Sequence, residues 1–140
     1  MHNKFFNCLK KINLEKRLVI RLKSGIVPRD LKNEYTQLSG IKNFIYSDEE
    51  SPIESINKSE LVIVAYDSTF FLESLTLNKP TCLFIRKDFW EMSEDSRPYF
   101  DKFLECGILH YDEQSLVSHI SNVKHDYSSW WQSDSVQLSV

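Results

Sequence analysis

The sequence has little glycine, no excess of positive charge and no long apolar run. Its 3 glycines form no phosphate loop of the Walker type, which argues against an ATPase. A formal net charge of −3 gives no reason to expect a nucleic acid as a partner. No segment approaches the ~20 apolar residues that span a bilayer, and the N-terminus lacks the apolar core and cleavage site of a signal peptide. These absences predict a cytoplasmic globular domain.

The cysteines indicate neither disulfides nor a metal site. There are three, an odd number spread along the chain: Cys8, Cys82 and Cys106. We expect reduced, mostly buried thiols, as in a cytoplasmic protein. None of the 4 histidines stands at a metal-ligand spacing from a cysteine, and His119 is interpreted as a residue of a helix surface. The sequence therefore predicts no bound metal.

Short apolar runs alternate with helix-like segments. The runs are 18–20, 43–46, 61–65, 81–85 and 107–111, and the last four are followed by the helix-like segments 51–58, 69–78, 94–106 and 114–123. Strands alternating with helices indicate βαβ units, and a run that is apolar at every position is typical of a strand covered on both faces. The sequence therefore predicts an α/β, Rossmann-like, doubly wound domain. We expect a mainly parallel five-stranded sheet in the order 2-1-3-4-5, with 61–65 and 81–85 inside and helices on both faces.

A polar turn interrupts the stretch VAYDSTFFLESL between Val64 and Leu75. It follows a buried strand and opens a helix, the place where ligands of open α/β sheets bind and where free backbone N–H groups attract anions. The hydroxyls of Ser68 and Thr69 can donate to a phosphate there. Glu73, one helical turn later, can accept hydrogen bonds from vicinal sugar hydroxyls. Taken alone, the turn is explained more simply as a helix N-cap and Glu73 as a surface residue.

The same residues resemble a known family. The stretch DSTFFLESLTLNKPTCLF is similar to the donor-half motif of GT-B glycosyltransferases, in which a serine/threonine turn opens a helix that carries Glu and ends near Lys-Pro. Two later stretches, DFWEMSEDSRPYFDKFLECGILHYDEQSLVSHI and YSSWWQSDSVQ, resemble the C-terminal part of bacterial transferases of surface-carbohydrate biosynthesis. More distantly, the chain is similar to CDP-glycerol glycerophosphotransferases and capsule polysaccharide transferases. The resemblance covers about residues 17 to 137.

The resemblance implies a donor site and its residues. Ser68 and Thr69 match the turn that contacts the donor phosphates, and Glu73 matches the position that holds the donor ribose. Arg21, at the end of the first strand, matches an arginine that faces the same cleft and contacts phosphate. The implied ligand is a nucleotide-sugar or CDP-polyol donor, which is a substrate, so no separate cofactor is expected. Asp67 is expected to turn away from the phosphates.

The resemblance also implies how the chain is organised. Residues 1–140 are expected to form one Rossmann-like domain, the C-terminal donor-nucleotide half of a two-domain GT-B transferase, with 124–140 as a C-terminal helix or tail. In such enzymes the reaction takes place between the halves, and the general base is expected on the missing N-terminal half. This chain alone is therefore not expected to turn over a substrate. The full-length protein would be cytoplasmic, either free or peripheral at the inner face of the membrane.

Two further predictions concern partners. Trp130 and Trp131 point about 100° apart on a helix, so one packed face should not bury both. We expect at least one of them to contact the missing half or a second copy of the chain.

The alternative function is a non-enzymatic, receiver-like interaction domain, in which Asp67 would imitate a phosphorylated aspartate. Against it, Arg21-Leu22-Lys23 stands where a receiver needs its acidic pair, which favours an anionic ligand over Mg²⁺.

Overall fold

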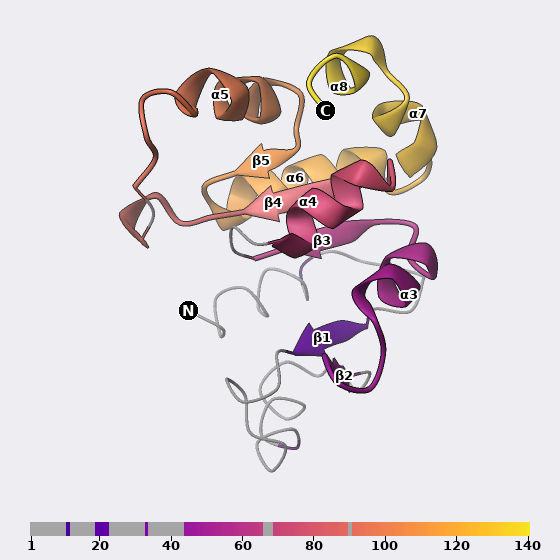
Figure 1. Ribbon diagram of the computed structural model, residues 1–140. Helices are drawn as coiled ribbons and strands as arrows, with labels where there is room; N and C mark the ends of the chain where they lie inside the picture. Colours follow the sequence, from indigo (N-terminus) through magenta and orange to yellow (C-terminus); the bar gives the residue numbers. More distant parts are fainter. Residues whose placement is uncertain (1–10, 12–18, 23–32, 34–43, 66–68, 90) are drawn as a thin grey trace.

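The computed structural model describes residues 11, 19–22, 33, 44–65, 69–89 and 91–140. Strands and helices alternate along it, as predicted (Figure 1). The strands are β1 (Ile20–Leu22), β2 (Phe44–Tyr46), β3 (Val62–Val64), β4 (Thr81–Phe84) and β5 (Leu109–His110). The helices are α3 (Pro52–Asn57), α4 (Thr69–Thr76), the 3₁₀ helix η2 (Lys87–Phe89), α5 (Arg97–Glu105), α6 (Glu113–Val123), α7 (Tyr127–Trp131) and α8 (Asp134–Gln137). Every strand overlaps the apolar run that predicted it.

The described strands pair in parallel, but they form two sheets rather than one. β1 pairs with β2, and β4 pairs with β3 on one side and with β5 on the other. The predicted five-stranded sheet in the order 2-1-3-4-5 is wrong, because β1 and β3 share no backbone ladder within the described ranges. The prediction of 61–65 as an inner strand is wrong for the same reason. β3 lies at the edge of the three-stranded sheet, and β4 alone lies inside it.

Strand β3 is apolar at every position because both of its faces are covered. Val62 and Val64 belong to the larger core cluster, together with Phe71 of α4. Leu61 and Ile63, which alternate with them, pack against the smaller cluster on the opposite face. An uninterrupted apolar run therefore indicates two covered faces, and it does not show how many strands flank the run.

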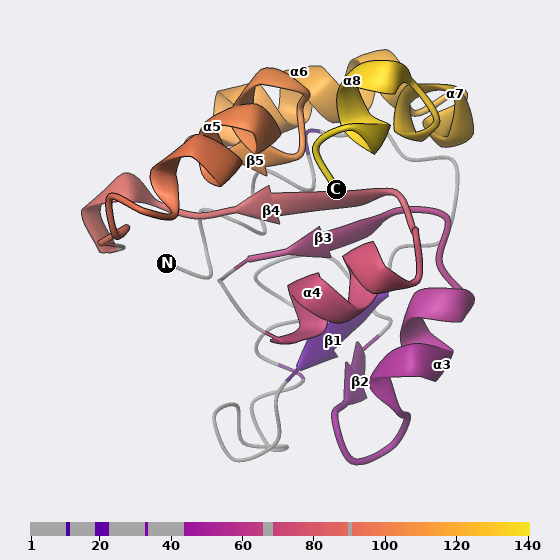
Figure 2. The same ribbon diagram turned by 45° about the horizontal axis from the view of Figure 1, so that its top comes forward.

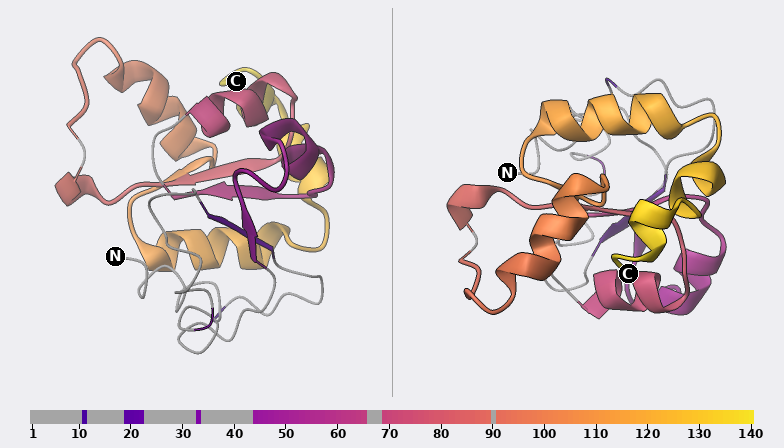
Figure 3. Two further views of the ribbon diagram at one scale, coloured as in Figure 1. Left: turned by 60° about the horizontal axis from the view of Figure 1, so that its bottom comes forward. Right: turned by 90° about the horizontal axis from the view of Figure 1, so that it is seen from above.

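Helices cover both faces of the three-stranded sheet, as predicted (Figure 3). On one face, Leu116 and Ile120 of α6 pack against Cys82 and Phe84 of β4. On the other face, α4, α5, α7 and α8 contribute side chains to the larger cluster, which includes Leu83. Figure 2 shows α4 lying along β3, beside α3. The two clusters meet at β4, whose residues are all buried.

Helices α3 and α6 begin at side-chain caps. Ser51 and Glu54 form a capping box at the start of α3, with Pro52 at the first helical position. At the start of α6, the Asp112 carboxylate accepts a hydrogen bond from the Ser115 backbone N–H at 2.7 Å. Both caps join residues that lie three apart in the sequence.

Helix α4 ends in a Schellman turn built on asparagine. Asn78 has a φ of +54°, and its N–H bonds to the Leu75 carbonyl at 2.9 Å, while the Lys79 N–H bonds to the Ser74 carbonyl at 3.1 Å. The Asn78 side-chain oxygen also accepts a hydrogen bond from the Trp131 indole at 2.9 Å. One residue thus ends α4 and anchors α7.

The two adjacent tryptophans both pack within their own chain, and the centroids of their rings lie 5.5 Å apart. Trp131 is 1% exposed and lies in the larger cluster. Trp130 is half-buried; its indole N–H donates to the Cys106 carbonyl at 2.9 Å, and its ring lies edge-on to His119. Only Trp131 is fully buried, and Trp130 packs against both core clusters, so neither indole requires an outside partner. Contact with a missing half or a second copy stays a prediction. The tail 124–140 contains α7 and α8.

Substitution of Asn78 by glycine and by alanine separates its two roles. Glycine adopts positive φ without strain, but it leaves the buried Trp131 N–H without its partner, at a cost of about 1–3 kcal/mol. Alanine adds left-handed strain of about 1 kcal/mol. Urea unfolding should therefore rank the stabilities as wild type, then Asn78→Gly, then Asn78→Ala. If Asn78→Gly is as stable as wild type, the hydrogen bond to Trp131 contributes nothing measurable.

Candidate functional site

The carboxyl ends of β3, β4 and β5 lie along one edge of their sheet, because the three strands are parallel (Figure 1). Helix α4 begins at Thr69, shortly after β3 ends. Lys87 follows the end of β4, and Tyr111 follows the end of β5. Ligands of open α/β sheets bind at this edge. We therefore take it as the candidate site.

The predicted phosphate-binding turn is described in part. Ser68 and its neighbour Asp67 lie outside the described residues, so their roles stay predictions. Thr69 is exposed as the first residue of α4, and Glu73 lies half-buried one turn further along. Residues four apart on a helix share one side. Helix α4 therefore brings these two predicted residues together.

Arg21 lies beside the first turn of α4, but it also has partners that the sequence does not reveal. Its Nη1 donates to the Glu50 carbonyl and to the Ser55 hydroxyl, both at 2.8 Å, and its Nη2 donates to the Ser47 carbonyl at 3.3 Å. Its guanidinium carbon lies 5.7 Å from the centroid of the Phe70 ring. Arg21 thus joins β1, the loop after β2, α3 and α4. These contacts stabilise one side of the candidate site.

The loop that Arg21 holds is also fixed by Glu50. The Glu50 carboxylate accepts hydrogen bonds from Lys58 and from Ser55, the latter at 2.6 Å. The pKa of Glu50 is lowered, first by the bond from Lys58, then by the bond from Ser55, with a smaller contribution from Arg21. Its negative charge therefore persists at neutral pH beside the guanidinium.

A pocket of about 240 Å³ opens on the same edge, between the ends of β4 and β5 and helix α5. It is lined by Lys87, Met92, Arg97, Asp101, Leu104 and Tyr111. The Lys87 ammonium lies 5.2 Å from the centroid of the Tyr111 ring. The pKa of Tyr111 is raised, mainly by burial and next by the charge of Asp101, while Arg97 opposes the shift. Two cations and one carboxylate leave the pocket suited to an anionic group.

A larger pocket, of about 480 Å³, lies at the opposite end of the strands. It is bounded by the turn between α4 and β4, which includes Lys79, and by the turn between α6 and α7, which includes His125. The Lys79 ammonium donates to the carbonyls of Asn57 and Ser59, at 3.3 and 3.4 Å, so it stabilises the chain there. Because this pocket lies at the amino ends of β3 and β4, away from α4's first turn, we do not place the candidate site in it.

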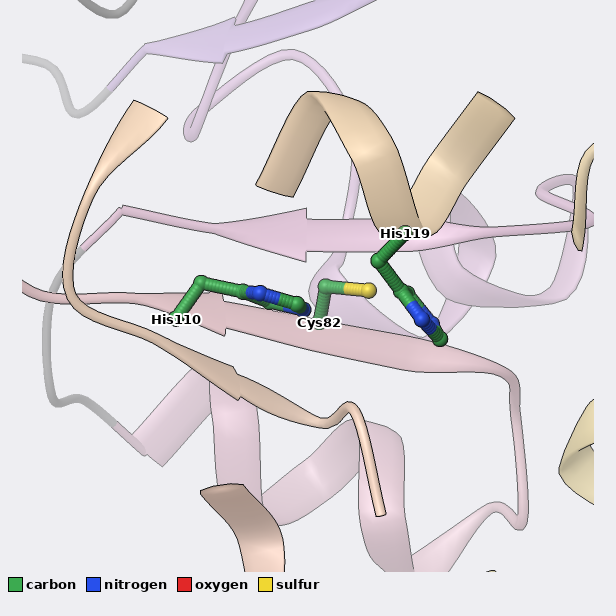
Figure 4. Close-up of side chains that lie close together, drawn as sticks. All are labelled: Cys82, His110 and His119. Atoms are coloured by element: carbon green, nitrogen blue, oxygen red, sulfur yellow. The ribbon is translucent and has the colours of Figure 1, made fainter. Parts of the chain in front are cut away.

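A third group of polar side chains lies inside the molecule, between β4, β5 and α6. One potential ligand atom each of Cys82, His110 and His119 lies within 4.8 Å of the other two (Figure 4). Cys82 and His110 are buried, and the His119 ring lies 5.1 Å from that of His110 and 4.5 Å from that of Trp130. The prediction that His119 belongs to a helix surface is therefore wrong, because α6 turns this residue inward.

Burial sets the protonation of these three groups. It lowers the pKa of His119 to about 4, with a smaller contribution from His110. It also lowers the pKa of His110, against the opposing effect of a hydrogen bond to the Gly107 carbonyl, and it raises the pKa of Cys82. At neutral pH both imidazoles are neutral and the thiol is protonated.

The match to a known family covers the chain from residue 1 to residue 140, and the family is described as the LIC12162 family transferase. The chain belongs to this transferase family. The match confirms the predicted resemblance to transferases. It does not test the GT-B organisation or the likeness to CDP-glycerol enzymes, which stay predictions. No curated protein and no solved structure matches the chain.

Among the residues that the structure describes, no helix is long and apolar enough to cross a membrane.

Sequence reasoning about this transferase missed the pocket formed by Lys87, Arg97 and Tyr111. One local signal was present: Arg86-Lys87 follows directly after a buried strand, where a cation faces the ligand edge of the sheet. The other members come from α5 and from the end of β5. Their meeting is a tertiary contact, and no spacing in the sequence encodes it.

Replacing Arg21 by lysine should destabilise the fold. A lysine ammonium cannot reach the carbonyls of Ser47 and Glu50 and the Ser55 hydroxyl together, so we expect a loss of about 2 kcal/mol in the free energy of unfolding. Urea denaturation measures the loss, with Arg97→Lys on the exposed face of α5 as a control that stays within about 0.5 kcal/mol. Unchanged stability in Arg21→Lys would show that these bonds contribute nothing.

Proposed function

We propose that the chain binds the nucleotide-activated donor of a group-transfer reaction, as the donor half of a GT-B transferase in bacterial surface-polysaccharide biosynthesis. Membership of a transferase family supports the reaction class. The observation that carries the proposal is the carboxyl edge of the β3-β4-β5 sheet. There α4 begins with Thr69, and a pocket lined by Lys87 and Arg97 opens nearby.

The donor diphosphate binds at the start of α4. Free backbone N–H groups in the first turn and the positive end of the helix dipole attract its charge. The hydroxyls of Ser68 and Thr69 add donors, and each hydrogen bond to a charged group is worth roughly 1.5–3 kcal/mol. Adjacent strands lie about 5 Å apart, so Lys87, which follows the neighbouring β4, supplies further positive charge close to the same edge.

Glu73 binds the donor ribose. It lies one turn into α4 on the side of Thr69, and its carboxylate can accept hydrogen bonds from two vicinal hydroxyls. Arg21 has a double role in this proposal. It holds the loop after β2 in place, and its positive charge lies beside Phe70 in the first turn of α4, where it favours an anion.

The transferred group lies towards the pocket between Lys87, Arg97 and Tyr111. This pocket can take a sugar or polyol that carries negative charge, or the second phosphate of the donor. The general base is supplied by another part of the full enzyme, as the GT-B organisation implies. The chain alone is therefore proposed to bind donors without turning them over.

Calorimetric titration of nucleoside diphosphates into the chain tests this proposal. UDP, CDP and GDP are compared with inorganic phosphate in wild type, Ser68→Ala, Thr69→Val, Glu73→Gln and the control Thr76→Val. Thr76 is also an exposed threonine of α4, but it lies in the last turn, where its hydroxyl bonds to the Leu72 carbonyl. We expect Ser68→Ala and Thr69→Val each to weaken diphosphate binding about ten-fold, and Thr76→Val to leave it unchanged.

Glu73→Gln distinguishes the ribose contact from the phosphate contact. It should weaken binding of the nucleotides and spare inorganic phosphate, because only the nucleotides carry a ribose. Equal affinities in all five proteins would contradict the site and leave Ser68 as a helix cap. Binding of Mg²⁺ without any affinity for nucleotides would favour the receiver-like interaction domain instead.

A further inference from the structure

The cluster of Cys82, His110 and His119 has no part in the proposed donor site, and its hydrogen bonds are incomplete. The Nε2 of His110 lies 2.8 Å from the Gly107 carbonyl, which can only accept, so this nitrogen carries the proton. The Nδ1 of His110 therefore accepts from the Ser115 hydroxyl, also at 2.8 Å. The Nε2 of His119, in contrast, is buried and has no hydrogen-bond partner in the described part of the chain.

A buried polar atom without a partner costs about 1–3 kcal/mol, so its persistence calls for an explanation. The ring of His119 is held in place on several sides. A Cβ atom on Gly107 would lie 2.5 Å from the His119 Cε1, and Gly107 has a φ of +86°, which favours glycine. The rings of Trp130 and His110 flank the imidazole. The fold therefore keeps this nitrogen inside, close to a thiol and a second imidazole.

We propose that Cys82, His110 and His119 form a binding site for a zinc ion. One thiolate and two imidazoles are the ligand types that zinc prefers, and three protein ligands leave a fourth position for water or a backbone oxygen. The Gly107 carbonyl is a candidate for that position, since both Cys82 Sγ, at 3.9 Å, and His110 Nε2 are directed at it. Figure 4 shows Cys82 between the two histidines.

Only small movements are needed to close the site. Ligand atoms bound to one zinc at 2.0–2.3 Å lie about 3.3–3.8 Å apart in a tetrahedron, so separations of up to 4.8 Å must shrink by at most about 1.5 Å. Zinc replaces the thiol proton of Cys82, which passes to solvent. His119 is already neutral and offers the lone pair of Nε2. His110 binds the metal through Nε2 once its proton has moved to Nδ1. Nδ1 then donates to the Ser115 hydroxyl, the outer contact typical of metal-bound histidines.

The metal would join three elements that are distant in sequence: β4, β5 and α6. Its binding free energy would add to the stability of the folded chain, because the unfolded chain does not hold the three ligands together. The site lies on the face of the sheet covered by α6, whereas α4 covers the opposite face. Zinc is therefore expected to act on stability and to leave the donor site untouched.

The test uses the full chain, reduced and made metal-free with a chelator. Titration with Co²⁺ should produce a thiolate charge-transfer band in the near ultraviolet, and one equivalent of Zn²⁺ should remove it. Zinc affinity is then measured in competition with a chromophoric chelator. We expect Cys82→Ala to lose the band and His119→Gln to weaken zinc binding at least about 100-fold, whereas Ser115→Ala, which removes an outer contact, weakens it about ten-fold.

Two matched controls are present in the chain. Cys106→Ala and His125→Gln remove a half-buried thiol and an exposed imidazole outside the cluster, and both should leave zinc binding unchanged. Circular dichroism shows whether each variant is folded. If Cys82→Ala does not fold, the spectrum of the wild type decides. A folded wild type without the cobalt band, or equal zinc affinity in wild type and His119→Gln, overturns the proposal.

Discussion

Strand β4 is buried on both faces and paired on both edges, and the rest of the described structure depends on it. Cys82 and Phe84 lie under α6, while Leu83 and Ile85 lie in the larger core on the other face. Fully burying one such side chain is worth about 1.5–3 kcal/mol. The parallel ladders to β3 and β5 then bring the carboxyl ends of all three strands to one edge. The same burial also places the thiol of Cys82 beside two histidines.

Much of this fold is predictable from short stretches of sequence. The apolar runs mark the strands, and the capping box at Ser51 and the cap at Asp112 mark two helix starts. The arrangement of the strands is not predictable in the same way. The apolar residues of β3 indicate that both of its faces are covered by other side chains, and they are. They do not indicate how many strands pair with it, and β4 is its only partner in the described ladders. Edge pairing depends on backbone contacts between distant segments, which leave no comparable pattern in composition.

Only part of the candidate site can likewise be predicted from the sequence. Thr69 and Glu73 follow from helical spacing within one segment, so the sequence places them correctly on α4. The partners of Arg21 come from the loop after β2 and from α3, and the pocket of Lys87, Arg97 and Tyr111 joins β4, β5 and α5. The inward turn of His119 likewise depends on how α6 packs on the sheet. Contacts between distant helices and strands can be identified only once the folded structure is known.

In the proposed function, the carboxyl edge of the three-stranded sheet binds a nucleoside diphosphate. Backbone amide shifts, recorded by heteronuclear NMR as UDP or CDP is added to the ¹⁵N-labelled chain, test it most directly. We expect perturbations concentrated in the first turn of α4 from Thr69 and around Lys87 and Tyr111. Perturbations concentrated instead around Lys79 and His125, at the opposite end of the strands, would contradict it, as would an unchanged spectrum at millimolar nucleotide.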